Sequence, residues 1–293
     1  MTVRTVQRGR AGYPPRLAEL HDPPAQLYVR GACDLDALAA PAVAIVGARS
    51  CSAYGGQVAR VLARDLAAAG LVVVSGLARG IDGEAHRGAL AAGGTTVAVL
   101  GCGIDRDYPA RHAELAGRIR ATGLVVSEYG PGVEPAPWRF PARNRIVAGL
   151  ALATVVVEAR ERSGALITAD FALELGREVF AVPGEITSAL SAGSNRLIRQ
   201  GASPLLEVDD VLFALGVEPV AAASAPAISP AARAVLERLV DSPRALDELV
   251  LACRRDAGEV AAALVELELA GLALESDGVY RPSSDAARSA IAV

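Results

Sequence analysis

The segment 138–168 holds the side chains best suited to binding an anion. Arg139, Arg143 and Arg145 crowd the start of a predicted helix. We place that start at Pro141, because the first turn of a helix does not need the missing proline N–H. Cations at a helix start are repelled by the helix dipole, which indicates an anion that offsets the repulsion. Backbone N–H groups with guanidinium groups beside them would form a phosphate site.

Two aromatic residues flank these arginines. Trp138 and Phe140 offer flat faces on which a nucleobase could stack. The competing interpretation is that the arginines are solvated surface residues and that both rings belong to the core. The segment alone does not distinguish the two, because a motif stays a hypothesis until its structural context is known.

Acidic residues and a histidine raise the alternative of catalysis. His86 follows Asp82 by one helical turn, a spacing that suits an acid–base or metal pair. We expect instead a local hydrogen bond that fixes the helix after Gly80, because no third ligand has the right spacing. Glu128 and Glu158 end two predicted strands and could form a two-carboxylate site of the glycosidase type. They could equally accept N–H groups of a helix start or hold arginines, and the sequence leaves these alternatives open.

Several cofactor and catalytic classes are excluded by what the sequence lacks. The four cysteines are scattered without the spacing of a metal site or a disulfide framework. All 29 basic residues are arginine, so a Walker-type ATPase, which needs a lysine, is excluded. The first strand-to-helix turn does not have the G-x-G-x-x-G pattern, and G-x-S-x-G is absent. We therefore expect neither a metal nor a cofactor.

Short apolar runs rich in β-branched residues recur between residues 43 and 182. Most of the intervening segments, such as 58–69 and 84–92, are long enough for a crossover helix. Continuous apolar runs are typical of strands buried on both faces, so the pattern predicts an open α/β fold with a mostly parallel sheet. The predicted strands are 43–46, 71–74, 96–100, 124–126, 154–157 and 178–182, with weaker strand-like runs at 26–29 and 204–206.

The turns that follow these strands are polar and rich in glycine. Since the ligand of an open α/β sheet lies beyond the carboxyl ends of its strands, these turns predict an extended groove along one rim. After the sixth strand, Asn195, Arg196 and Arg199 lie on or beside a helix and could extend that groove or pair with acids.

The length of 293 residues favours one large domain and a small one. Residues 1–40 are a proline-containing arm that we expect to pack on the main domain, 41–216. An Ala/Pro/Ser linker occupies 217–229. No apolar run is long enough for a membrane span and the N-terminus has no signal-peptide pattern, so we expect a cytoplasmic protein that does not enter a membrane.

Residues 230–285 have the pattern of a small winged-helix domain. Helical runs at 230–240, 245–253 and 256–270 precede a ribbon at 272–281 whose turn is Asp277-Gly278. The third helix, which usually contacts DNA in such domains, carries four acids and no arginine. Because phosphates would repel it, we interpret this domain as a protein-contact or packing module.

Eight motifs in family order make the chain resemble the DNA-processing protein DprA (Smf) family. They are VAIVGAR, SGLARGIDGEAH, AVLGCGIDRDYP, SEYGPG, FPARNRIVAGL, VVVEARERSGALITA, AVPG and GSNRLIRQGA, which together cover roughly residues 41–205. The resemblance implies an extended Rossmann-like domain that binds single-stranded DNA without catalysis. It also implies a homodimer that protects incoming DNA and helps to load the RecA recombinase during natural transformation.

Site residues follow from the resemblance by their place in these motifs. Arg49 resembles the principal phosphate-contacting arginine, while the family often has asparagine at His112. Gly47, Ser75 and Gly76 are implied as backbone N–H cradles for phosphate, and Phe140, Arg143, Asn144 and Arg145 match the FPxRNR element. The remaining DNA-binding residues implied in this way are Arg111, Ser163, Gly164, Thr168 and Asn195.

Two other functions compete with DNA binding. The fold is also similar to that of nucleoside-monophosphate phosphoribohydrolases, but their PGGxGT signature is missing, since residues 183–185 are Pro-Gly-Glu. A transcriptional regulator acting through the winged helix is the other alternative. The net charge of −4 requires any nucleic-acid surface to be a local patch.

Overall fold

The computed structural model describes residues 2–218, 228–276 and 278–283. The chain divides into two compact units, residues 1–220 and 221–293, each of which has its own hydrophobic core. No helix within the described ranges is long and apolar enough to cross a membrane.

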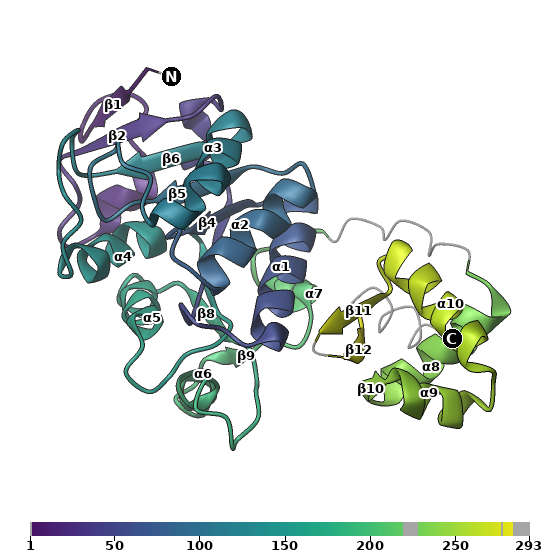
Figure 1. Cartoon of the computed structure of the whole chain (residues 1–293). Coiled ribbons are helices and arrows are strands. Elements are labelled where there is room, and N and C mark those ends of the chain that lie inside the picture. The colour runs from purple at the N-terminus through teal and green to yellow at the C-terminus, as the bar shows by residue number, and fades with distance from the viewer. Residues whose placement is uncertain (1, 219–227, 277, 284–293) are drawn as a thin grey trace. The chain divides into compact units, whose positions relative to one another are not determined.

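The first unit is built on a nine-stranded sheet with the order β1-β2-β6-β5-β4-β3-β7-β8-β9 (Figure 1). All neighbours from β6 to β9 are parallel, while β1 and β2 are antiparallel additions beside β6. The mostly parallel α/β sheet predicted from the sequence is confirmed. The strands are β1 (Arg4–Gln7), β2 (Gln26–Arg30), β3 (Ala42–Val46), β4 (Val72–Ser75), β5 (Thr96–Val99), β6 (Leu124–Ser127), β7 (Ala153–Val156), β8 (Glu178–Ala181) and β9 (Ser203–Pro204).

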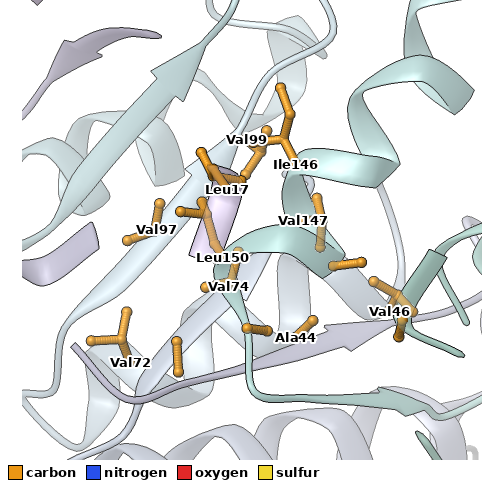
Figure 2. Packing of buried hydrophobic residues seen from close by; sticks show 14 of the residues in the cluster. Leu17, Ala44, Val46, Val72, Val74, Val97, Val99, Ile146, Val147 and Leu150 are labelled. Carbon is orange, nitrogen blue, oxygen red and sulfur yellow. The ribbon is translucent and has the colours of Figure 1, made fainter. Parts of the chain in front are cut away.

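Helices cover both faces of this sheet, because successive side chains of each buried strand point to opposite sides. Val43 and Ile45 of β3 pack in the core cluster of one face, whereas Ala44 and Val46 pack in the other (Figure 2). One face carries α1 (Ala53–Ala68), α2 (Ile81–Ala91), α3 (Ala113–Thr122) and α7 (Val208–Ala214). The other carries α4 (Arg139–Leu150), α5 (Gly164–Glu174), α6 (Ala192–Arg199) and the 3₁₀ turn η1 (Pro15–Glu19). Two further 3₁₀ turns are η2 (Leu35–Leu38) and η3 (Ala110–His112).

The chain reverses its direction across the sheet between β3 and β7. From β3 it proceeds through β4 and β5 to β6, and from β7 it proceeds the other way through β8 to β9. The helices that follow β3 and β7, α1 and α5, therefore lie on opposite faces. A crevice opens beyond the carboxyl ends of two such strands, which is where ligands bind in open α/β sheets.

Helix α4 begins at Arg139, two residues before the predicted start at Pro141. Pro141 still lies in the first turn, where its missing N–H breaks no helical hydrogen bond. Strand β1 was not predicted, because only Val6 of its four residues is buried and a run this polar gives no apolar signal.

The second unit consists of three helices and a three-stranded sheet with the order β10-β12-β11. Its elements are α8 (Pro230–Asp241), β10 (Arg244–Ala245), α9 (Leu246–Cys253), α10 (Ala257–Leu269), β11 (Ala273–Ser276) and β12 (Val279–Pro282). The predicted winged-helix domain is thereby confirmed, although the short β10 was missed. Gly278 of the predicted turn has φ +78°, while Asp277 lies outside the described residues.

Candidate nucleic-acid interface

Two adjoining cavities lie beyond the carboxyl ends of the parallel strands. The first cavity, of about 200 Å³, lies at the reversal between β3 and β7 and is lined by residues after β3, on α4 and at the start of α5. The second cavity, of about 360 Å³, is lined by the turns after β4 and β5 and by the loop that leads into η3. Four residues line both cavities: Arg49, Ala78, Phe140 and Arg143.

Most of the predicted site residues line one of these cavities. Those around the first are Gly47, Arg49, Phe140, Arg143, Asn144, Ser163, Gly164 and Thr168. Gly76 and Arg111 line the second. The structure thus brings together Arg111 and residues from four of the predicted motifs, which span positions 47–168 of the chain.

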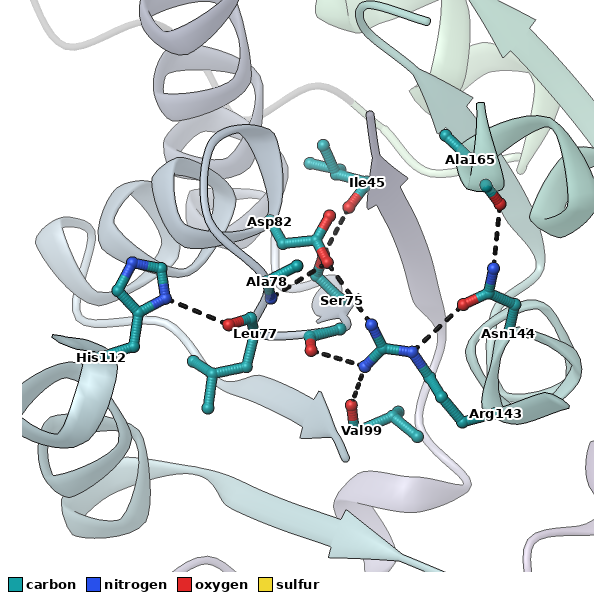
Figure 3. A network of polar contacts seen from close by, with 12 residues as sticks. Ile45, Ser75, Leu77, Ala78, Asp82, Val99, His112, Arg143, Asn144 and Ala165 are labelled. Atoms are coloured by element: carbon teal, nitrogen blue, oxygen red, sulfur yellow. Dashed lines mark hydrogen bonds and ion pairs between the residues drawn. The ribbon is translucent and has the colours of Figure 1, made fainter. Parts of the chain in front are cut away.

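Arg143 lies inside the wall between the cavities, and its side chain is only 6% exposed. Its Nη1 donates hydrogen bonds to the carbonyl oxygens of Gly76, at 2.5 Å, and Val99, while Nη2 lies 3.8 Å from Asp82 (Figure 3). Burial lowers the pKa of Arg143 and raises that of Asp82, and each charge offsets the effect on the other. Arg143 therefore braces the ends of β4 and β5, and its Nη1 donors are already engaged.

Gly76 is required by this brace rather than by a ligand. A Cβ at that position would overlap the guanidinium group of Arg143. Gly47 is similarly confined, because a Cβ there would lie 2.6 Å from Cγ1 of Ile81. These glycines make room for the protein's own side chains, which is a different role from the close ligand approach expected of them.

Arg49 is exposed, and its guanidinium carbon lies 5.3 Å from the centroid of the Phe140 ring. The ring of Tyr108 stacks on the same ring at a centroid distance of 5.3 Å and an interplanar angle of 25°. Arg79 and Arg111, which line the second cavity, are exposed as well. Within the described part of the chain none of these three arginines has a carboxylate within 4 Å, so their charges are available to an anion.

The turn that carries Arg79 is held in an unusual conformation. Leu77 is fully buried and has φ +58°, a value that costs a non-glycine residue about 1 kcal/mol or more. Nδ1 of His112 donates a hydrogen bond to the Leu77 carbonyl at 3.0 Å, and the Ala78 N–H donates one to Asp82 at 3.2 Å. These two contacts hold the carbonyl and the N–H of the peptide group between Leu77 and Ala78, and so fix the direction in which the turn projects Arg79.

The start of helix α5 forms the opposite wall of the first cavity. Ser163 caps the helix by accepting a hydrogen bond from the Ala165 N–H, and Asn144 donates one to the Gly164 carbonyl at 2.9 Å. Thr168, a residue only 1% exposed, also lines this cavity. A helix N-terminus carries partial positive charge and free N–H groups, so this wall favours an anion.

Three predicted site residues line neither cavity. Ser75 is fully buried and donates a hydrogen bond to the Ile45 carbonyl at 2.6 Å. Arg145 pairs with Glu128 at 2.6 Å and donates to the Asp22 carbonyl. Asn195 forms two hydrogen bonds with the backbone of Gly184, at 2.9 and 3.1 Å. The structure gives all three residues partners within the protein.

Both strand-end glutamates are engaged in structural contacts. Glu158 accepts hydrogen bonds from the N–H and the hydroxyl of Ser52 at the start of α1, at 2.9 and 2.5 Å. Glu128 holds Arg145. Of the alternatives left open by the sequence, helix capping is confirmed for Glu158 and arginine binding for Glu128.

The expected hydrogen bond between Asp82 and His86 is wrong. His86 is fully buried, and its Nδ1 lies 2.7 Å from Oγ1 of Thr96, whose hydroxyl donates to the Val73 carbonyl. The Thr96 oxygen must therefore accept from His86, which places a proton on Nδ1. Burial, with smaller contributions from His112 and Arg143, lowers the pKa of His86 to about 3. Among the described residues no group of three or more His, Cys, Asp or Glu could hold a metal ion.

Sequence reasoning missed Arg79 and Tyr108 as cavity residues. Arg79 follows β4 in a glycine-rich turn, so its position at the strand-end rim was itself a usable signal. Tyr108 precedes η3 in a loop without periodic pattern, and nothing in the sequence indicates that its ring meets Phe140.

The chain matches two protein-family models. Residues 4–216 match DNA recombination-mediator protein A, and residues 218–278 match the DprA winged helix domain. It is 46% identical over 266 residues to a putative DNA processing protein DprA of Mycobacterium tuberculosis, covering 88% of this chain and 68% of that relative. It is 48% identical over 200 residues to DNA processing protein DprA of Streptococcus pneumoniae, covering 68% of this chain and 70% of that relative.

Two solved structures have the same fold. The X-ray structure of DNA processing protein A from Streptococcus pneumoniae has a TM-score of 0.69 and 45% identity, covering 73% of this chain and 74% of that one. The structure from Helicobacter pylori, described for the unique single-stranded DNA binding mode of that protein, has a TM-score of 0.66 and 31% identity. It covers 73% of this chain and 96% of its own.

Proposed function

The chain belongs to the DNA recombination-mediator protein A (DprA, Smf) family, and on that premise we propose that it is a non-enzymatic single-stranded DNA-binding protein. The observation that carries the proposal is a set of three exposed arginines that have no carboxylate partner among the described residues and lie around an aromatic pair at the strand ends. They are Arg49, Arg79 and Arg111. The arginines can bind phosphates and the aromatic rings can stack on bases. Proteins that bind unpaired strands combine these two kinds of contact.

The shape of the site favours single strands over duplex. The two cavities are small, Phe140 lines both and Tyr108 lines the second, so a base can reach them only when it is unpaired. Binding through phosphates and aromatic faces tolerates any sequence and weakens with salt, because counterions are released from the strand. Because the chain has a net charge of −4, it can bind nucleic acid only through a local basic patch, and the three arginines form such a patch.

The wider role that we propose is the one implied by the family. The protein protects incoming single-stranded DNA in the cytoplasm and helps to load the RecA recombinase during natural transformation. The description of the matching family as a recombination mediator supports this role.

We propose further that the protein acts as a homodimer, so that two sites can engage one strand and raise the avidity. Two exposed apolar side chains of the first unit offer contacts to a second copy. Leu206 is 78% exposed and Phe213 is 89% exposed.

The acidic side chains near the strand ends already have partners within the protein, which supports a role without catalysis. Glu128 and Glu158 are committed to Arg145 and Ser52, and the buried His86 bonds to Thr96. Asp82, the acid that lines the first cavity, lies between the Ala78 N–H and Arg143. A phosphoribohydrolase-like enzyme, the alternative function, needs an acid free to work on a glycosidic bond.

A gel-shift titration tests the proposal directly. A dT oligomer and a matched duplex are titrated with the full chain at two salt concentrations. We expect the dT oligomer to bind more tightly than the duplex, and both affinities to fall at the higher salt. Equal or tighter binding of the duplex would contradict the proposal. Incubation with nucleoside monophosphates provides the second arm, since release of free base would establish the alternative.

A further inference from the structure

The second cavity differs from the first in its charge. The residues that line it include no acid, whereas Asp82 lines the first cavity. Arg79 and Arg111 line only the second cavity, are exposed, and form no hydrogen bond or ion pair within the described part of the chain. A phosphate in the second cavity therefore meets two free cations and no opposing carboxylate.

The aromatic faces of the site are also unequal. The Phe140 ring already contacts the Arg49 guanidinium group and the Tyr108 ring, each 5.3 Å from its centroid. Tyr108, by contrast, remains 43% exposed while it stacks on Phe140. A base can therefore extend the existing stack at Tyr108 without displacing either partner of Phe140.

We propose that the second cavity is a separate nucleotide subsite, in which Tyr108 stacks a base of the unpaired strand and Arg79 and Arg111 bind its flanking phosphates. This inference rests on the proposed function and extends it. Because Arg49 and Phe140 line both cavities, the strand passes over them from the first cavity to the second. The fixed turn at Leu77, held by His112 and Asp82, presents Arg79 to this subsite in advance of binding.

The test separates base stacking from phosphate binding. Fluorescence anisotropy measures the affinity of the full chain for a short dT oligomer and for the same strand with abasic residues in place of the thymidines. Tyr108→Leu is expected to weaken binding of the dT oligomer about fivefold or more. It is expected to leave binding of the abasic strand unchanged, since no base remains to stack. Tyr108→Phe retains the ring and is expected to bind both strands as the unmodified chain does.

Arg79→Gln provides the complementary readout. It is expected to weaken binding of both strands and to reduce the slope of log affinity against log salt by about 0.7, the value for one phosphate contact with a single strand. The matched control is Arg118→Gln, which removes an exposed arginine on α3 that lines neither cavity. Thermal unfolding confirms that each variant is folded.

The inference fails independently of the proposed function. If Tyr108→Leu and Arg79→Gln bind dT as the unmodified chain does while Arg49→Glu loses affinity, the strand does not enter the second cavity and the DNA-binding function stands. If Tyr108→Leu weakens both strands equally, Tyr108 does not stack a base and the subsite is refuted. If the unmodified chain binds no single strand, the proposed function itself fails.

Discussion

Replacing Arg49 by glutamate tests the binding site with little risk to the fold. Its side chain is exposed, and within the described residues its one ring contact is the Phe140 face at 5.3 Å. A cation–π contact at an exposed site contributes about 0.5–1 kcal/mol, so Arg49→Glu should lower the free energy of unfolding by no more than about 1 kcal/mol. A large loss of DNA affinity can then be assigned to the site.

The effect on binding is expected to be much larger than the effect on folding. A hydrogen bond to a charged group contributes about 1.5–3 kcal/mol, which corresponds to roughly a ten- to hundredfold loss of affinity when the arginine is removed. The new carboxylate adds repulsion of the phosphates. Because Arg49 lines both cavities, the loss should not depend on which end of the strand is bound.

The assay is fluorescence anisotropy of a labelled dT oligomer at several salt concentrations. Arg49→Glu should reduce both the affinity and its salt slope, the latter by about 0.7 or more. Arg118→Glu, an equal change of charge on α3 and outside both cavities, should retain most of the affinity. Equal losses in the two variants would show that net charge alone governs binding and would refute a specific site.

Three further outcomes follow from individual contacts. Phe140→Ala should weaken single-strand binding by about 1–3 kcal/mol if the ring supports the stack, and an unchanged affinity would remove Phe140 from the site. Arg143→Met should lower the free energy of unfolding in urea by about 3–5 kcal/mol, because Asp82 and two carbonyls lose their buried partner; a loss below about 1 kcal/mol would contradict the brace. The buried neutral His86, with its pKa lowered to about 3, binds a proton only in the unfolded chain below about pH 6.5, so stability should fall as the pH drops, by about 2 kcal/mol at pH 5. Urea unfolding of the unmodified chain and of His86→Gln should show the flatter pH profile in the variant, and identical profiles would contradict a buried neutral ring.

The fold was accessible from the sequence because its core strands are buried on both faces. Runs such as those of β3 and β4 are apolar without interruption, and the segments between them are long enough for crossover helices. The antiparallel pair of β1 and β2 was only half predicted. β1 is the edge strand and β2 lies between it and β6, and both have alternating or sparse burial, so that β2 gave a weak signal and β1 gave none.

The location of the two cavities was also predictable, but the separate roles of the residues around them were not. Strand-end turns gave the rim, and the resemblance gave half of the residues that line the cavities. The spacing of Arg143 and Arg145, by contrast, could not show which of them faces a ligand. Two residues apart on a helix they diverge by about 200°, and the burial of one among carbonyl groups depends on the neighbouring strands.

The anion expected beside the helix start is supplied by the protein itself. Arg139, Arg143 and Arg145 do face negative partners, as the repulsion by the helix dipole required, but these partners belong to the protein. Arg139 contacts the Glu134 carbonyl and the rings of Trp138 and Tyr129. Arg143 and Arg145 have the partners described above.

The free arginines come instead from strand-end turns and the loop before α3, where no carbonyl cluster competes for them. Arg49 and Arg79 follow β3 and β4, and Arg111 lies in η3. An arginine that satisfies buried carbonyls cannot leave them without a cost of about 1–3 kcal/mol for each group left unpaired, whereas an exposed one can turn to a phosphate at little cost. The arginines that bind DNA should therefore be those whose removal leaves the free energy of unfolding nearly unchanged, and this relation can be measured for all five, Arg49, Arg79, Arg111, Arg143 and Arg145.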